Sequence, residues 1–73
     1  MIKKLRKEID TIDRNILKLL KKRVKVCKEI GRAKNKLRMG IVDRKREEEV
    51  LKRSGTFKPI FKEIIKTCRK VQK

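Results

Sequence analysis

The apolar residues in the first half of the chain recur at alternating intervals of three and four positions. This series, here called the seam, has eleven members, and all of them except Arg23 are apolar. Such spacing aligns side chains along one face of an α-helix, as in a coiled coil. The pattern predicts one long helix over residues 2–37 whose seam consists of Ile2, Leu5, Ile9, Ile12, Ile16, Leu19, Arg23, Val26, Ile30, Ala33 and Leu37.

Turn signals occur around residues 39–40 and 54–55, and they divide the chain into three segments. Gly40 is expected to stop the long helix, and Asp43 to be the N-cap of a second helix over residues 44–53. A third helix is predicted to begin with Thr56 as its N-cap and to accommodate Pro59 in its first turn. Its apolar face comprises Phe57, Ile60, Phe61, Ile64, Ile65, Cys68 and Val71.

The predicted fold is therefore all-α, with one long helix and two shorter ones in a single domain over residues 1–73. A helix over residues 2–37 is roughly 55 Å long at 1.5 Å per residue, whereas a compact chain of this size has a radius of gyration of about 11 Å. The remaining residues are too few to cover it. A second copy of the same seam can do so, which favours an antiparallel or interlocked homodimer.

Charge and composition narrow the possible functions. The formal net charge is +17 and 48% of the residues are charged, so the surface attracts anions of some kind. A zinc site is not expected, because the chain has no His, and its two Cys residues are too few for a disulfide framework. No apolar stretch approaches the roughly 20 residues that span a membrane. These features predict a cytoplasmic protein.

Arg23 is the charged member of the seam, and an unpaired buried guanidinium is costly unless it binds an anion. Lys34 lies eleven residues further on, about 20° around the helix, so it shares a stripe with Arg23, Cys27 and Ile30. Two cations would then face one partly apolar groove. The simpler interpretation is an arginine that reaches water or Glu29.

Further candidates lie in the second and third helices. Asp43 and Glu47 share a face at the start of the second helix, beside Arg46, although acidic residues are also ordinary at a helix N-terminus. Cys68 and Gln72 share a stripe of the third helix, and they are equally compatible with a core thiol and a frayed terminus. The alternatives at these positions remain open on spacing alone.

Two residues of the long helix suggest contacts beyond it. Gly31 stands in mid-helix, where glycine costs about 1 kcal/mol relative to Ala, and this indicates a close approach by another element. Arg6 precedes Arg23 by seventeen residues, about 25 Å along the axis. It can join Arg23 only across an antiparallel dimer.

The segments LRKEIDTIDRNILKLLKKR, EIGRAK, DRKREEEVL and IFKEIIKTCRKVQ, in this order, resemble the all-helical class of chorismate mutases. The resemblance covers most of the chain. It implies an interlocked six-helix dimer with two equivalent active sites, and rearrangement of chorismate to prephenate in phenylalanine and tyrosine biosynthesis. It also implies that no metal or cofactor is needed, since the rearrangement is unimolecular.

The resemblance assigns the main catalytic roles to Lys34, Gln72, Arg23 and Glu47. Arg23 and Lys34 would clamp the two carboxylates of chorismate, Lys34 and Gln72 would donate to its ether oxygen, and Glu47 would contact the ring hydroxyl.

Four further positions are implied to bind substrate. Arg6 would come from the neighbouring subunit, Asp43 would share the contact to the ring hydroxyl, and Arg46 and Cys68 would line the site. Cys replaces a serine that is frequent at the position of Cys68.

Three other functions fit parts of the pattern. Isochorismate-pyruvate lyases share the fold and many of these contacts. A basic helical nucleic-acid-binding module would explain the charge, but the chain has no Trp or Tyr for base stacking, so no nucleic acid is expected as a partner. A plain coiled-coil dimerisation element would be weakened by Arg23 and Lys34.

Overall fold

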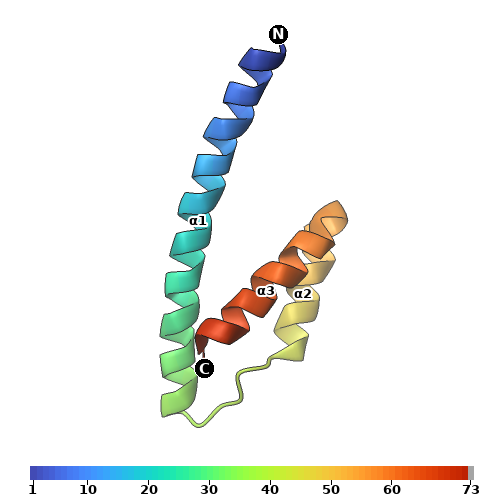
Figure 1. Cartoon of the computed structure of the whole chain (residues 1–73). Helices are drawn as coiled ribbons and strands as arrows, with labels where there is room; N and C mark the ends of the chain where they lie inside the picture. The colour runs from blue at the N-terminus through green and yellow to red at the C-terminus, as the bar shows by residue number, and fades with distance from the viewer. Residues whose placement is uncertain (73) are drawn as a thin grey trace.

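The computed structural model describes residues 1–72, and these residues are helical apart from the first residue and one connecting loop (Figure 1). Helix α1 spans Ile2–Lys36, α2 spans Arg44–Ser54, the 3₁₀ turn η1 spans Gly55–Phe57, and α3 spans Lys58–Gln72. The α2 and α3 segments are joined through η1 with no intervening coil. The all-helical prediction is confirmed for this part of the chain. None of its helices has both the length and the apolar character required to cross a membrane.

Helix α1 ends at Lys36, one residue before the predicted boundary, and the residue that terminates it is not the one expected. The N–H of Met39 donates to the carbonyl of Lys34 at 2.7 Å, and that of Arg38 donates to Asn35 at 3.2 Å. These two bonds form a Schellman motif, in which the residue after the C-cap adopts a left-handed conformation. That residue is Arg38, with φ of 57°, so the expectation that Gly40 stops the helix was wrong.

Helix α2 begins as predicted. Asp43 is its N-cap, and Oδ1 of Asp43 accepts a hydrogen bond from the N–H of Arg46 at 3.1 Å. The carbonyl of Asp43 also accepts the first intrahelical bond, from the N–H of Glu47 at 3.0 Å. Because the short side chain satisfies one of the free N–H groups of the first turn, the local sequence is sufficient to start the helix here.

The start of α3 differs from the prediction. Thr56 lies inside η1 rather than at an N-cap, and α3 begins at Lys58, one residue later than a helix capped by Thr56 would begin. Gly55 has a φ of 57°, which reverses the chain direction after α2. Pro59 falls in the first turn of α3, where its missing N–H has no helical partner in any case.

The core of a single chain is small and lies where α3 crosses α1. Its buried members are Cys27 of α1, Val50 of α2, and Ile65 and Gln72 of α3. Cys27 and Cys68 form a disulfide with a Cα–Cα separation of 5.5 Å, so the two cysteines are paired rather than free. This single crosslink was not predicted from the sequence, where two cysteines are too few for a disulfide framework.

The molecule is elongated, with extents of 54 × 23 × 14 Å and a radius of gyration of 15.3 Å. Figure 1 shows the N-terminal half of α1 projecting away from α2 and α3. Seam residues along this half are about half exposed, between 47% at Ile16 and 66% at Ile2. One chain therefore leaves most of its seam uncovered.

Candidate functional site

A groove of about 350 Å³ lies between the C-terminal half of α1, the following loop, α2 and α3. This volume is within the range of small-molecule sites in proteins. The groove gathers seven of the eight site residues predicted from sequence: Arg23, Lys34, Asp43, Arg46, Glu47, Cys68 and Gln72. Its apolar walls come from Val26, Ile30, Ile41, Val50 and Ile65.

Arg23 enters the groove without a carboxylate partner among residues 1–72. Its Nη1 lies 3.5 Å from Sγ of Cys27, and it forms no ion pair with Glu29. Burial lowers the pKa of the Arg23 guanidinium, and the positive charges of Arg46 and Arg53 lower it further. Because Arg23 is surrounded by like charge, a bound anion would relieve an unfavourable interaction.

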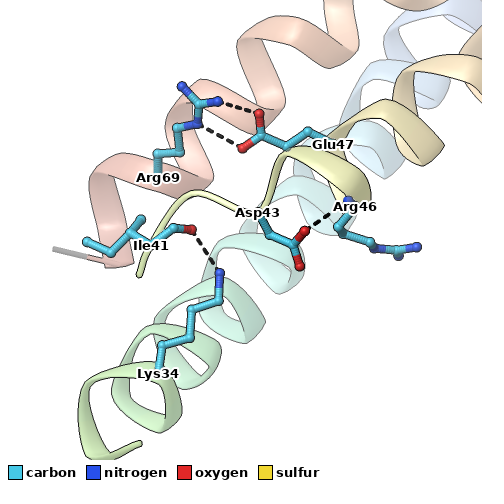
Figure 2. Close-up of polar contacts among 6 residues, drawn as sticks. All are labelled: Lys34, Ile41, Asp43, Arg46, Glu47 and Arg69. Carbon is cyan, nitrogen blue, oxygen red and sulfur yellow. Dashed lines mark hydrogen bonds and ion pairs between the residues drawn. The ribbon is translucent and has the colours of Figure 1, made fainter. Parts of the chain in front are cut away.

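Lys34 reaches across the groove floor to the loop that follows α1. Its Nζ donates to the carbonyl of Ile41 at 2.8 Å, as Figure 2 shows. The side chain is half-buried, and a neutral carbonyl leaves its charge uncompensated. A lysine ammonium has three donors, so this bond leaves two of them for a ligand.

Glu47 faces Arg69 across the groove wall, and the two side chains form a bidentate ion pair (Figure 2). Nε of Arg69 donates to Oε2 of Glu47 at 2.9 Å, and Nη2 donates to Oε1. The hydrogen bond to Glu47 raises the pKa of the Arg69 guanidinium. Arg69 was not among the site residues predicted from sequence, although it follows Cys68 in the segment IFKEIIKTCRKVQ, which carries part of the family resemblance.

Arg46 pairs with a residue of its own helix, and not with a residue across the groove. Its Nη1 lies 3.4 Å from Oε2 of Glu49, and both side chains are more than half exposed. Such an exposed pair contributes little to stability. Arg46 therefore lines the rim of the groove and adds to its positive potential, while the backbone N–H of the same residue is used by the Asp43 cap.

Gln72 closes the groove at the end of α3, and it is only 7% exposed. Its Nε2 donates to Sγ of Cys68 at 3.1 Å, while Oε1 is buried without a hydrogen-bond partner in the part of the chain the structure describes. A Cβ placed on Gly31 would lie 2.7 Å from Cα of Gln72. Gly31 thus permits the close approach that the sequence indicated, and the last turn of α3 is packed against α1 rather than frayed.

Cys68 contributes a sulfur atom but no thiol hydrogen, because it is bonded to Cys27. Both sulfurs touch residues that the sequence analysis selected, Arg23 on one side and Gln72 on the other. Arg6 is absent from the groove of its own chain. It lies in the exposed second turn of α1, seventeen residues before Arg23 and about 25 Å away along the helix.

Comparison with known proteins connects this arrangement with a family. The chain is 43% identical over 68 residues to a 3-dehydroquinate dehydratase from Pyrobaculum aerophilum, covering 93% of this chain and 23% of that protein. It is 37% identical over 86 residues to the bifunctional chorismate mutase/prephenate dehydratase of Aquifex aeolicus, covering 99% of this chain and 24% of that protein. The chain thus spans about a quarter of the length of these curated relatives.

A solved structure shares the fold over its whole length. It is a conserved hypothetical protein from Pyrococcus furiosus, with a TM-score of 0.98 and 51% sequence identity, covering 99% of this chain and 95% of the solved one. The profile of the family described as chorismate mutase type II matches residues 5–59. Since that match covers most of the sequence, the chain belongs to the chorismate mutase type II family.

Proposed function

We propose that residues 1–73 form a chorismate mutase domain, which rearranges chorismate to prephenate. The observation that supports this most directly is the convergence of Arg23, Lys34 and Gln72 on one groove with apolar walls. Chorismate carries two carboxylates. A guanidinium that has no carboxylate partner among residues 1–72, together with a half-buried ammonium on the same groove, favours a small dianion. The reaction belongs to phenylalanine and tyrosine biosynthesis, and we propose a cytoplasmic location for it.

The rearrangement is unimolecular, so the residues need to fold the substrate rather than to attack it. Chorismate has a flexible enolpyruvyl arm that must lie over its ring before the new C–C bond can form. Arg23 and Lys34 would bind the carboxylates at fixed points and hold this reactive conformer. Fixing a flexible reactant in a near-attack geometry removes much of the entropic part of the barrier. Bidentate contacts from Arg are well suited to holding a carboxylate in place, because they fix its orientation as well as its distance.

As the C–O bond breaks, negative charge grows on the ether oxygen. Donors already aimed at that oxygen stabilise the transition state more than the substrate. Lys34 would supply one donor with a proton that the Ile41 carbonyl does not use. Gln72 would supply the other through Nε2, exchanging its contact to the sulfur of Cys68 for one to the substrate. The amide of Gln72 is neutral at all pH values, so it donates without gaining a proton.

Glu47 and Asp43 would accept a hydrogen bond from the ring hydroxyl. Glu47 keeps 20% of its side chain exposed, so solvent and ligand can reach its carboxylate. Arg46 at the rim would add positive potential along the entry path. Cys68 would line the site through its sulfur.

We also propose that the working unit is an interlocked homodimer, a six-helix bundle with two equivalent sites. Three aspects of one chain support it: the uncovered seam, the 54 Å length, and a core of very few buried side chains. In an antiparallel pairing the first turns of the partner's α1 would pass beside the later turns of this chain's α1. Arg6 of one chain would then complete the site of the other.

The activity is tested by incubating purified protein with chorismate and, separately, with isochorismate. Formation of prephenate supports the proposal, and pyruvate plus salicylate would identify an isochorismate-pyruvate lyase instead. Arg23→Ala and Gln72→Ala should each lower kcat/KM by about a hundredfold or more, because each removes a group aimed at developing or fixed negative charge. Lys25→Ala is the matched control, since it removes a cation from the exposed side of α1. Near-control rates in either groove variant would contradict the assigned roles.

The dimer is tested by subunit mixing. Arg6→Ala and Arg23→Ala homodimers should both be nearly inactive. When the two are unfolded together and refolded in equal amounts, half of the dimers are mixed, and each mixed dimer has one intact site, which gives about a quarter of wild-type activity. No recovery would mean that Arg6 does not act across the interface. As a second test, Ile12→Glu on the seam should give monomers by light scattering, whereas Asn15→Glu on the exposed face should not.

A further inference from the structure

The Arg69–Glu47 ion pair is the one bidentate contact between α2 and α3 in the part of the chain that the structure describes. The two residues are 22 positions apart in sequence, and both line the groove. Glu47 is the more enclosed partner, with 20% of its side chain exposed compared with 42% for Arg69. The carboxylate is therefore the less exposed end of a pair whose two members both line the groove.

This geometry limits the freedom of Glu47. A glutamate side chain has three rotatable bonds, and an unpaired one samples several rotamers. The planar guanidinium donates to both carboxylate oxygens at once, which fixes the plane of the carboxylate as well as its position. Each oxygen has a second lone pair, so two acceptor sites remain for a ligand.

The pair also divides the cations of the groove into two groups. Arg69 is neutralised by Glu47, and its charge is not available to a dianion without breaking two hydrogen bonds. Arg23 has no carboxylate partner among the described residues, and Lys34 bonds only to a backbone carbonyl. Arg46 does not compete for Glu47, because its guanidinium pairs with Glu49, and both of these side chains are exposed.

We infer that Arg69 is a positioning residue, which holds the Glu47 carboxylate in the orientation that accepts the hydrogen bond of the substrate's ring hydroxyl. This inference rests on the proposed function and deepens it. Arg69 does not bind the substrate itself. Its effect on catalysis passes through Glu47, and it should therefore disappear when either Glu47 or the ring hydroxyl is removed.

The test measures kcat and KM for chorismate in Arg69→Met, Glu47→Gln and the double variant. Lys66→Met is the matched control, because it removes one positive charge from an exposed position one turn earlier on α3. Arg69→Met should lower kcat/KM by about tenfold to a hundredfold, the range expected when a catalytic contact is misplaced by an ångström or less. In the Glu47→Gln background the same change should lower it less than threefold. Arg69→Lys should recover only part of the loss, because an ammonium cannot make the two parallel bonds.

A second readout separates positioning from a general structural role. Inhibition constants are measured for a dicarboxylate transition-state analogue with and without the ring hydroxyl. The wild type and Lys66→Met should prefer the hydroxylated compound, and Arg69→Met should lose that preference while binding the other compound as before. Circular dichroism and light scattering verify that each variant is folded and in the wild-type oligomeric state.

Three outcomes would overturn the inference. The first is a kcat/KM of Arg69→Met equal to that of Lys66→Met. The second is an equally large effect of Arg69→Met on kcat/KM with Glu47 and with Gln at position 47. The third is an Arg69→Met variant that still prefers the hydroxylated inhibitor. In all three the wild type still converts chorismate, so the proposed function stands. A wild type that leaves chorismate unchanged overturns the proposed function, and this inference with it.

Discussion

Reducing the disulfide between Cys27 and Cys68 should destabilise the protein strongly. The bond joins α1 to α3 across 41 residues. In the unfolded chain it closes a loop that contains the end of α1 from Cys27 onward, all of α2 and most of α3. The chain-entropy relation gives about 4 kcal/mol of stabilisation for a loop of this length at 25 °C. This is a large fraction of the 5 to 15 kcal/mol that stabilises an ordinary domain.

The assay is equilibrium unfolding in guanidinium chloride, followed by circular dichroism, with and without a phosphine reductant. Protein concentration is held constant, because unfolding of an oligomer depends on it. With a denaturant slope of about 2 to 3 kcal/mol/M for a chain of this size, the expected loss lowers the midpoint by roughly 1.3 to 2 M. The Cys27→Ala/Cys68→Ala double variant is the control, and its midpoint should not respond to the reductant.

Two results would refute this reasoning. Two free thiols per chain in the native, unreduced protein would show that the bond does not form. A midpoint that stays constant although thiol titration confirms complete reduction would show that the loop-closure argument does not apply here, because other contacts already restrict the unfolded chain.

Three other predictions follow from single positions or from the overall charge. Gly31→Ala should lower kcat about tenfold to a hundredfold, because the added Cβ would lie 2.7 Å from Cα of Gln72 and displace the last turn of α3. Gly40→Ala is the control and should leave activity unchanged, because a Cβ at Gly40 would have no atom within 4 Å. Arg38→Gly should raise the free energy of unfolding by roughly 0.5 to 1 kcal/mol, measured by thermal denaturation, because Arg38 has a left-handed φ of 57° that glycine adopts without strain. Raising the ionic strength from about 0.05 to 0.5 M should lower kcat/KM for chorismate, because the net charge of +17 attracts a dianion through a field that salt screens, and a flat profile would contradict it.

Local signals were sufficient to predict some features of the fold. The seam predicted α1 to within one residue at its end, since a regular spacing over ten turns has few other interpretations. Asp43 predicted the start of α2, because an N-cap acts on N–H groups only two or three residues away. Such features depend on neighbours in sequence and can be predicted without knowing the rest of the fold.

Features that depend on distant segments were missed. The left-handed residue after α1 is Arg38 rather than Gly40, because the position is set by where the loop must turn toward α2 and not by the nearest glycine. The Cys27–Cys68 bond and the Arg69–Glu47 pair join residues 41 and 22 positions apart. Nothing in the spacing of either pair indicates contact. Both depend on the crossing of α3 over α1 and α2, which the sequence does not display.

The same crossing explains why seven of the eight predicted site residues meet in one chain while Arg6 does not. The groove needs only the later turns of α1, together with α2 and α3, and one chain supplies all of these. The first turns of α1 extend beyond them with an exposed apolar seam and a cation that has no role in its own groove. In the proposed dimer, the antiparallel pairing of two α1 helices would both cover this apolar face and bring Arg6 to the partner's groove. Stability and catalysis would then depend on one interface, and a seam substitution that prevents pairing should abolish both together.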